Sequence, residues 1–151
     1  MKFHLDHKPK KSQVSLTHSD SSFFIGSCFS EHLHNFLNRS GFNSFSNHFG
    51  SIFNPHSIFS EIEELIKGSA INPAMLVERN STWYALLAHS HISASSAAEL
   101  EQLLMQKRKQ ALAHLKTSQV IFITLGTAWY YVLKSQKAIV ANCQKLPQQL
   151  F

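Results

Sequence analysis

The sequence predicts an α/β protein built on a parallel β-sheet. Two apolar segments, at about residues 22–26 and 120–125, each end at a glycine. Amphipathic helical segments lie between them, as in sheets whose parallel strands are joined by helices. With 151 residues, 44% of them hydrophobic and 15% charged, the chain has the length and composition of one domain with a buried core. We therefore expect a domain over residues 21–151, preceded by a polar segment over residues 1–20.

The first strand and helix are predicted on either side of a short turn. The apolar run at 22–26 breaks at Gly26, and the turn then presents Ser27 and Cys28, two small nucleophilic side chains. Apolar residues recur at helical spacing until Gly41, at Phe29, Leu33, Phe36 and Leu37. In an open α/β sheet such a turn lies at the carboxyl end of a strand and at a helix N-terminus, where ligands bind and negative charge is favoured.

The second helix is marked at both ends. Residues 41–54 are rich in Gly, Asn, Ser and Phe without a helical period, which predicts a structured loop over the sheet. Asn54 before Pro55 predicts a helix cap, and Gly68 predicts the end of the helix. The expected buried face consists of Ile58, Phe59, Ile62, Leu65 and Ile66.

The remaining elements follow from shorter patterns. Residues 83–91 predict a short strand, and Ser96 with Glu99 forms a capping box that opens a helix to about residue 116. The expected buried face of that helix consists of Leu100, Leu103, Leu104, Ala111 and Leu115. The continuous apolar run at 120–125 is typical of a central parallel strand buried on both faces. Residues 130–140, with polar residues at 134–137, predict a hairpin.

Charge and cysteine content exclude several classes of protein. The net charge of +5 comes from 14 basic and 9 acidic residues, with much of the excess at 7–11 and 107–109. No basic stripe alternates with aromatic residues, so we expect no nucleic-acid partner. Cys28 and Cys143 form no Cys-x-x-Cys motif, which predicts free thiols in a reducing compartment. No signal peptide or run of about 20 apolar residues occurs, which predicts a cytoplasmic protein without a membrane partner.

The histidines of this chain bear on two kinds of site, a metal centre and a catalytic base. Ten are present, and His89 and His91 have the i, i+2 spacing that puts two imidazoles on one face of a strand. No third Cys, Asp or Glu stands at ligand spacing, so we expect no metal ion and no cofactor. His89 and His91 are instead candidates for a catalytic base.

Several segments, in order along the chain, resemble the GSCFA family. That family is named for a motif that stands here as Gly26-Ser27-Cys28-Phe29-Ser30. Residues 47–55, 88–93, 124–131 and 140–147, followed by Phe151, are also similar to family segments, so that the resemblance covers about residues 14–151. Two positions depart from the family pattern: His48 replaces a proline, and Gln144 replaces a histidine.

The GSCFA family is similar to the SGNH/GDSL hydrolases, and this implies a fold and an activity. The hydrolase motif Gly-Asp-Ser-Leu-Ser/Thr-Glu aligns with residues 26–31 without a gap, with Cys28 in the place of the catalytic serine. The resemblance implies a three-layer, parallel-sheet SGNH/flavodoxin-like fold, of which this chain forms the N-terminal half. It also implies hydrolysis of an ester or other acyl bond in a small molecule or glycan, with Cys28 as nucleophile and Ser27 as the alternative.

The resemblance also nominates pocket residues. Gly126 holds the place of the glycine in the hydrolases' Gly-x-Asn-Asp motif, but Ala128 and Trp129 replace its Asn-Asp pair. The candidates for the oxyanion site and pocket are Gly26, Gly126, Thr127, Asn54 and Asn142. The Asp and His expected near the end of the family domain are not found, so we expect a C-terminally truncated member that is inactive by itself.

Two other interpretations follow from the missing acid and base. The chain could instead be a non-catalytic binding or interaction module, or a decayed gene product. An incomplete parallel sheet also leaves an unpaired strand edge and uncovered apolar surface, which predicts self-association.

Overall fold

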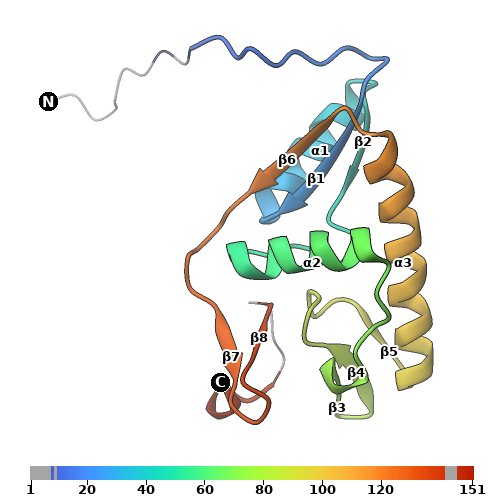
Figure 1. Ribbon diagram of the computed structural model, residues 1–151, viewed down its shortest axis with the longest axis vertical. Helices are drawn as coiled ribbons and strands as arrows, with labels where there is room; N and C mark the ends of the chain where they lie inside the picture. The colour runs from blue at the N-terminus through green and yellow to red at the C-terminus, as the bar shows by residue number, and fades with distance from the viewer. Residues whose placement is uncertain (1–7, 9, 142–145) are drawn as a thin grey trace, which may run out of the picture.

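The computed structural model describes residue 8, residues 10–141 and residues 146–151. The elements follow one another as shown in Figure 1. They are β1 (Ser21–Gly26), α1 (Cys28–Arg39), β2 (Asn43–Ser46), α2 (Pro55–Lys67), β3 (Leu76–Arg79), β4 (Thr82–Ala85), β5 (Ser93–Ala94), α3 (Ala97–Thr117), β6 (Val120–Thr124), β7 (Tyr131–Leu133) and β8 (Ala138–Val140). Short 3-10 turns occur at Pro73–Met75 and Gln148–Leu150.

A parallel sheet organises the part of the molecule that holds the Ser27–Cys28 turn. Its strand order is β2-β1-β6, and β1 pairs in parallel with both neighbours. The predicted α/β class with a parallel sheet is therefore confirmed. The strand β2 was not predicted, because the segment 41–54 was expected to form only a loop. Phe45 is the one apolar residue of β2, so the strand lacks the apolar run that marks β1 and β6.

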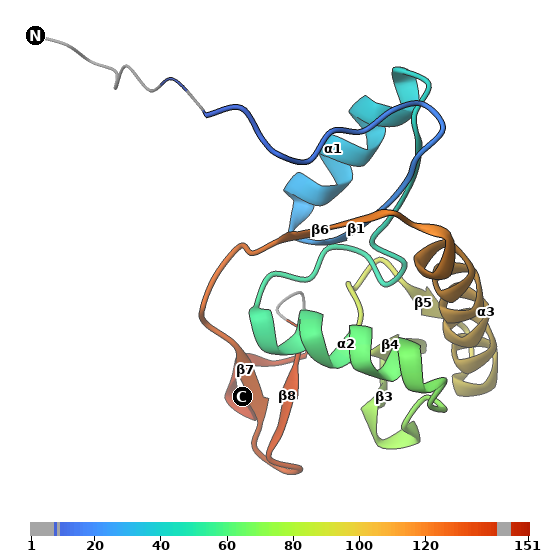
Figure 2. The same cartoon turned by 45° about the horizontal axis from the view of Figure 1, so that its top comes forward.

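Helices lie on both faces of this sheet. Figure 2 shows α1 on one side and α2 with α3 on the other. On the α1 side, Phe24 stacks on Phe122 with ring centroids 4.5 Å apart. On the other side, Phe23 and Ile25 join the main core with buried residues of α2 and α3. The central strand β1 is therefore buried along its whole length.

Both long helices begin where the sequence predicts. The Ser57 N–H donates to Asn54 Oδ1 at 2.8 Å, and the Glu99 N–H donates to Ser96 Oγ at 3.2 Å. The predicted buried face of α2 is wrong at Phe59 and Ile66, which are 55% and 65% exposed. Glu61 of the same helix is buried instead, and no hydrophobic pattern predicts the burial of a carboxylate.

Residues 120–125 were predicted to form a strand buried on both faces. The strand is present as β6, but it is not buried on both faces. Among the described strands β6 pairs only with β1, so it is an edge strand. Ile121 and Ile123 are 47% and 40% exposed. Both lie on the face that α2 and α3 cover at β1, but at β6 the described chain leaves that face open.

The other elements form two antiparallel units. The hairpin predicted at 130–140 is confirmed as β7-β8, and the strand predicted at 83–91 occurs as β4, between β3 and β5. β4 ends at Ala85, and the chain turns before it reaches His89, with the Ala88 N–H donating to Ala85 O at 3.2 Å. None of the helices in the described part of the chain is long and apolar enough to cross a membrane.

His34 on α1 gives the fold a pH dependence. Its Nδ1 lies 2.8 Å from Ser44 Oγ of β2, and burial lowers the pKa of His34 from its ordinary value, against a smaller raising effect of Glu31. The unfolded chain therefore binds a proton at pH values where folded His34 does not. Stability then increases with pH between the folded pKa and the ordinary value.

We expect the melting temperature to fall between pH 7 and pH 5, and to fall less steeply in His34→Asn, which retains a hydrogen-bonding group near Ser44. Thermal unfolding followed by circular dichroism at pH 5, 6 and 7 measures both slopes. The control is His32→Asn, an exposed position on the same helix. Equal slopes for wild type and His34→Asn would contradict the assignment.

Candidate functional site

The candidate site lies where the carboxyl ends of β1 and β6 meet. Gly26 pairs with Thr124 at the end of the parallel register. The Ser27 N–H then donates to Thr124 O at 2.9 Å and lies 3.1 Å from Thr124 Oγ1. Helix α1 begins at the next residue, Cys28. The turn between strand and helix is therefore held against the neighbouring strand at this edge of the sheet.

The two nucleophile candidates differ in their surroundings. Ser27 is 7% exposed, and its Oγ lies 3.0 Å from Thr124 Oγ1. The same Thr124 hydroxyl lies 2.7 Å from Oγ of Ser30, which is fully buried. Cys28 is exposed, and its thiol has no hydrogen-bond partner among the described residues. The Ser27 hydroxyl thus helps fasten the turn, whereas the Cys28 thiol is open to solvent.

The backbone donors expected from the glycines are already used. The Gly26 N–H donates to Asn47 Oδ1 at 2.9 Å. The N–H groups of Gly126 and Thr127 donate to Phe53 O at 2.9 and 3.1 Å. In this structure these three N–H groups are not open to a ligand oxygen, although the residues line the same edge of the sheet.

The first turn of α1 supplies other donors. The first N–H groups of a helix have no intrahelical acceptor. Within the described chain the N–H groups of Cys28 and Phe29 have no other acceptor, and the side chain of Ser27 does not cap them. They lie next to the exposed thiol. The sequence predicts that negative charge is favoured at this helix N-terminus, but it does not assign the N–H of Phe29 as a donor.

The loop after β2 holds the turn from its other side. The Ile52 N–H donates to Gly26 O at 2.8 Å, and Asn47, which also binds the Gly26 N–H, has φ +40°. Gly126 lies against the turn, since a Cβ on it would be 3.3 Å from the Ser27 Cβ. Asn47 and Thr124 were part of the family segments but were not predicted as site residues. Their roles depend on contacts between segments far apart in sequence.

His89 and His91 lie next to each other, though not on a strand. Their Nδ1 atoms are 2.8 Å apart and their ring centroids 4.6 Å apart. Both pack on Gly50, where a Cβ would be 2.5 Å from His89 Cβ and 2.7 Å from His91 Cε1. Neither is in hydrogen-bond contact with the Cys28 thiol. No three His, Cys, Asp or Glu side chains gather as metal ligands in the part of the chain described.

The two asparagine candidates have different outcomes. Asn54 is fully buried and caps α2, with its Oδ1 accepting from the Ser57 N–H and its Nδ2 donating to Ser57 Oγ at 3.0 Å. These contacts account for its side chain as a helix cap. Asn142 lies outside the described residues, as do Cys143 and Gln144.

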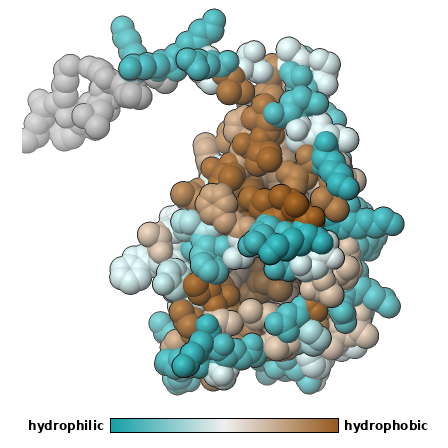
Figure 3. Space-filling model, viewed as in Figure 1, coloured by the Kyte–Doolittle hydropathy of each residue, from teal (hydrophilic) through white to brown (hydrophobic). Residues whose placement is uncertain are grey.

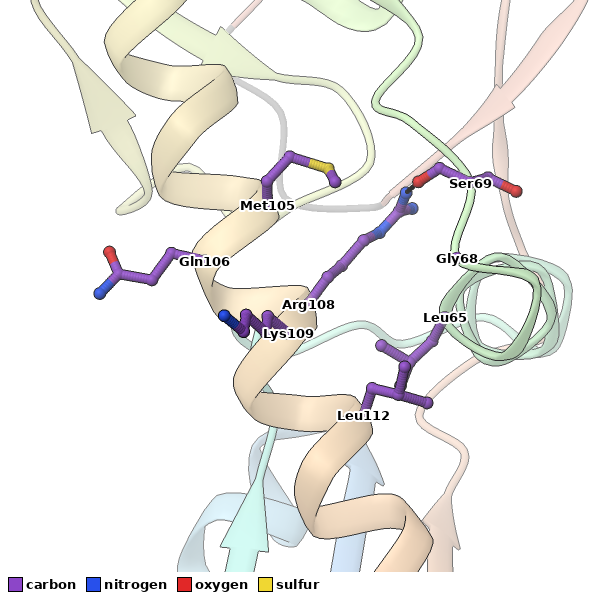
Figure 4. Close-up of a pocket in the computed structure, with 8 residues that line it drawn as sticks. All are labelled: Leu65, Gly68, Ser69, Met105, Gln106, Arg108, Lys109 and Leu112. Atoms are coloured by element: carbon purple, nitrogen blue, oxygen red, sulfur yellow. Dashed lines mark hydrogen bonds between the residues drawn. The ribbon is translucent and has the colours of Figure 1, made fainter.

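A pocket of about 470 Å³ lies elsewhere, between the end of α2 and the middle of α3 (Figure 4). It is lined by Leu65, Gly68, Ser69, Met105, Gln106, Arg108, Lys109 and Leu112. No predicted site residue is among them. The guanidinium of Arg108 donates to Ser69 O at 3.0 Å within the protein. We therefore place the candidate site at Cys28, which carries an exposed nucleophile, and not in this pocket.

Most of the chain matches a known protein family. Residues 21–151 match the GSCFA family. No curated protein and no solved structure matches the chain. The family match begins at the first residue of β1 and includes the Ser27–Cys28 turn, the loop that binds it, and the end of β6.

Proposed function

The chain belongs to the GSCFA family, and we propose that it supplies the nucleophile for hydrolysis of an acyl ester, with Cys28 as the attacking residue. The observation that carries this proposal is the contrast between two neighbouring side chains. The Cys28 thiol is exposed at the first residue of α1, whereas the Ser27 hydroxyl is buried against Thr124. An attacking atom must reach the substrate carbonyl, and only the thiol is placed to do so.

The proposed reaction has two steps. A base takes the thiol proton, and the Cys28 sulfur attacks the ester carbonyl carbon to form a tetrahedral intermediate. The carbon–oxygen bond to the alcohol then breaks, the alcohol leaves with a proton from an acid, and a thioester remains on Cys28. Water attacks the thioester, releasing the carboxylic acid and regenerating the thiol. We keep His89 and His91 as the candidates for the base. No contact among the described residues assigns that role to another side chain.

The first turn of α1 favours this chemistry at Cys28. Negative charge develops on the carbonyl oxygen in the intermediate, and N–H donors already in place stabilise it. The N–H groups of Cys28 and Phe29 are the open donors beside the thiol. The helix N-terminus adds a favourable potential for that charge. We therefore propose these two N–H groups as oxyanion donors in place of those of Gly26, Gly126 and Thr127.

The proposed fold, substrate class and location rest on the family resemblance. We propose the three-layer SGNH/flavodoxin-like fold, because the order β2-β1-β6 corresponds to the first three strands of the 2-1-3-4-5 order of such sheets. The proposed substrates are acyl esters of small molecules or glycans. A cytoplasmic location is also proposed, since a thiol nucleophile is kept reduced there.

The test compares two substitutions in a family member that contains the acid–base pair of the resemblance. Cys28→Ala at the corresponding position is expected to lower hydrolysis of p-nitrophenyl acetate on the order of 10³-fold or more. Ser27→Ala is expected to retain most of the rate, because the Ser27 hydroxyl is proposed to hold the turn and not to attack the substrate. Circular dichroism checks that both variants fold.

The reverse pattern would show that Ser27 is the nucleophile. If neither substitution changed hydrolysis, the enzyme proposal would fail. The chain would then be better explained as a binding module, because no base among the described residues contacts the Cys28 thiol.

A further inference from the structure

Asn47 lies directly after β2 and contacts the turn between β1 and α1. Its backbone continues the pairing of the two strands, because its N–H donates to Phe24 O at 3.0 Å. Its side-chain Oδ1 accepts from the Gly26 N–H at 2.9 Å, and its Nδ2 lies 3.4 Å from Ser27 O. One amide group therefore spans two consecutive residues of the turn.

The side chain of Asn47 replaces a backbone acceptor. In a parallel pair, the Gly26 N–H would donate to the carbonyl oxygen of the residue that Asn47 occupies. That carbonyl instead accepts from the Gly50 N–H at 2.7 Å, because the chain leaves the sheet at Asn47, where φ is +40°. Asparagine meets both demands, since it tolerates a left-handed backbone and carries an amide like that of the main chain.

The contact at Ser27 O bears on the start of α1. The same oxygen accepts from the Ser30 N–H at 2.9 Å, which closes the first turn of the helix. From the side of β6, Thr124 O accepts from the Ser27 N–H at 2.9 Å. Asn47 and Thr124 thus hold the turn from two sides, and together they fix the direction of the first N–H groups of α1.

We propose that Asn47 is a positioning residue for the oxyanion donors beside the Cys28 thiol. The inference rests on the function proposed above. Asn47 acts through the backbone of the turn and not on the substrate, by keeping the N–H groups of Cys28 and Phe29 beside the sulfur. Donors held in place stabilise the developing charge, and a misplacement of about 1 Å can lower a rate on the order of 10²-fold. Loss of the amide is expected to slow attack on a carbonyl without covering the thiol.

Two reactions of the Cys28 thiol separate this role from thiol exposure. With p-nitrophenyl acetate, a sulfur–carbon bond forms through a tetrahedral oxyanion, p-nitrophenolate leaves and the thiol proton goes to water, so the rate depends on the donors. With iodoacetamide, the sulfur displaces iodide from a CH₂ carbon and no oxyanion forms. Both reagents are small and uncharged, which suits the brown side chains that Figure 3 shows over the part of the molecule where β6 and α1 lie.

The test measures both rates at Cys28 in the 151-residue chain, by mass spectrometry of its peptides. Asn47→Gly keeps the left-handed backbone and removes both side-chain contacts. It is expected to lower the acylation rate at least about tenfold and the alkylation rate by less than about twofold. The matched control is Asn80→Gly, because Asn80 also has a positive φ, +52°, in the turn between β3 and β4. This variant is expected to change neither rate.

The ratio of the acylation rate to the alkylation rate decides the outcome. An unchanged ratio in Asn47→Gly, whether both rates fall together or neither falls, would overturn the proposal, as would an equal fall of the ratio in Asn80→Gly. The wild type tests the proposed function separately. A ratio no higher in the folded than in the urea-unfolded chain would overturn the role of Cys28, and this inference with it.

A second variant serves if circular dichroism shows that Asn47→Gly does not fold. Asn47→Asp has the same size, and its carboxylate still accepts from the Gly26 N–H but cannot donate to Ser27 O. The ratio is again expected to fall, with Asn80→Asp as the control that leaves it unchanged. A wild-type ratio in Asn47→Asp would contradict the positioning role.

Discussion

Replacing Gly26 with alanine is expected to abolish stable folding, at a cost of more than about 4 kcal/mol. Gly26 has φ +137°, which L residues rarely adopt. A Cβ there would overlap the carbonyl oxygen of Thr124 and lie 2.9 Å from the Thr124 carbonyl carbon and nitrogen. Those are backbone atoms of the paired strand, so relief would require β1 and β6 to separate. The substitution therefore disrupts the sheet at the point that carries the candidate site.

Urea unfolding followed by circular dichroism measures this loss. The matched control is Gly68→Ala at the end of α2, where φ is +67° and a Cβ would meet no atom within 4 Å. That variant bears only the backbone cost of a left-handed residue, about 1–2 kcal/mol. If Gly26→Ala were no less stable than Gly68→Ala, the close packing of β1 on β6 would be disproved.

Removing the buried carboxylate of Glu61 is the second large change, with an expected loss of about 3–5 kcal/mol in Glu61→Gln. Glu61 is 4% exposed on α2, and Arg108 of α3 is 6% exposed. The guanidinium donates from Nε and Nη2 to the two carboxylate oxygens at 3.0 and 2.8 Å. His48 Nε2 also lies 2.9 Å from Glu61 Oε1. Without the carboxylate, Arg108 would remain as a buried charge without its partner.

Two controls separate burial from mere loss of an ion pair. Glu63→Gln breaks an exposed pair with Lys67 on the same helix, in which the side chains are 63% and 59% exposed, and is expected to leave the stability almost unchanged. The double variant Glu61→Leu with Arg108→Met is expected to be more stable than Glu61→Gln, because it leaves no unpaired charge inside. Urea unfolding ranks the three. Equal losses for Glu61→Gln and Glu63→Gln would refute the account of this buried pair.

The fold was predictable where local pattern and environment agree. The run Phe23-Phe24-Ile25 ending at Gly26, and the cap at Asn54, fixed β1 and the start of α2. The short strand β2 was missed because a polar edge strand carries no periodic signal. The inside positions of Glu61 and Arg108 were missed because each is buried only by virtue of the other, on a different helix.

The position of the Ser27–Cys28 turn in the fold was predictable, but its hydrogen bonds were not. The motif register placed Ser27 and Cys28 at the end of β1, and the structure has them there. The engagement of the Gly126 N–H by Phe53 O, and of the Ser27 hydroxyl by Thr124, arises from tertiary contacts that no local pattern encodes. His48, where the family has proline, donates to Glu61, which gives this departure a local structural role.

The central claim is that Cys28 carries the acyl group, and trapping that group tests it most directly. The chain is incubated briefly with p-nitrophenyl acetate, quenched in acid, and mapped by mass spectrometry of its peptides, with Cys143 as an internal reference thiol. The account predicts that one acetyl group accumulates on Cys28, faster than on Cys143 and faster than on Cys28 of the urea-unfolded chain. Acetylation of Ser27 in place of Cys28, or modification of Cys28 no faster than in the unfolded chain, would contradict it.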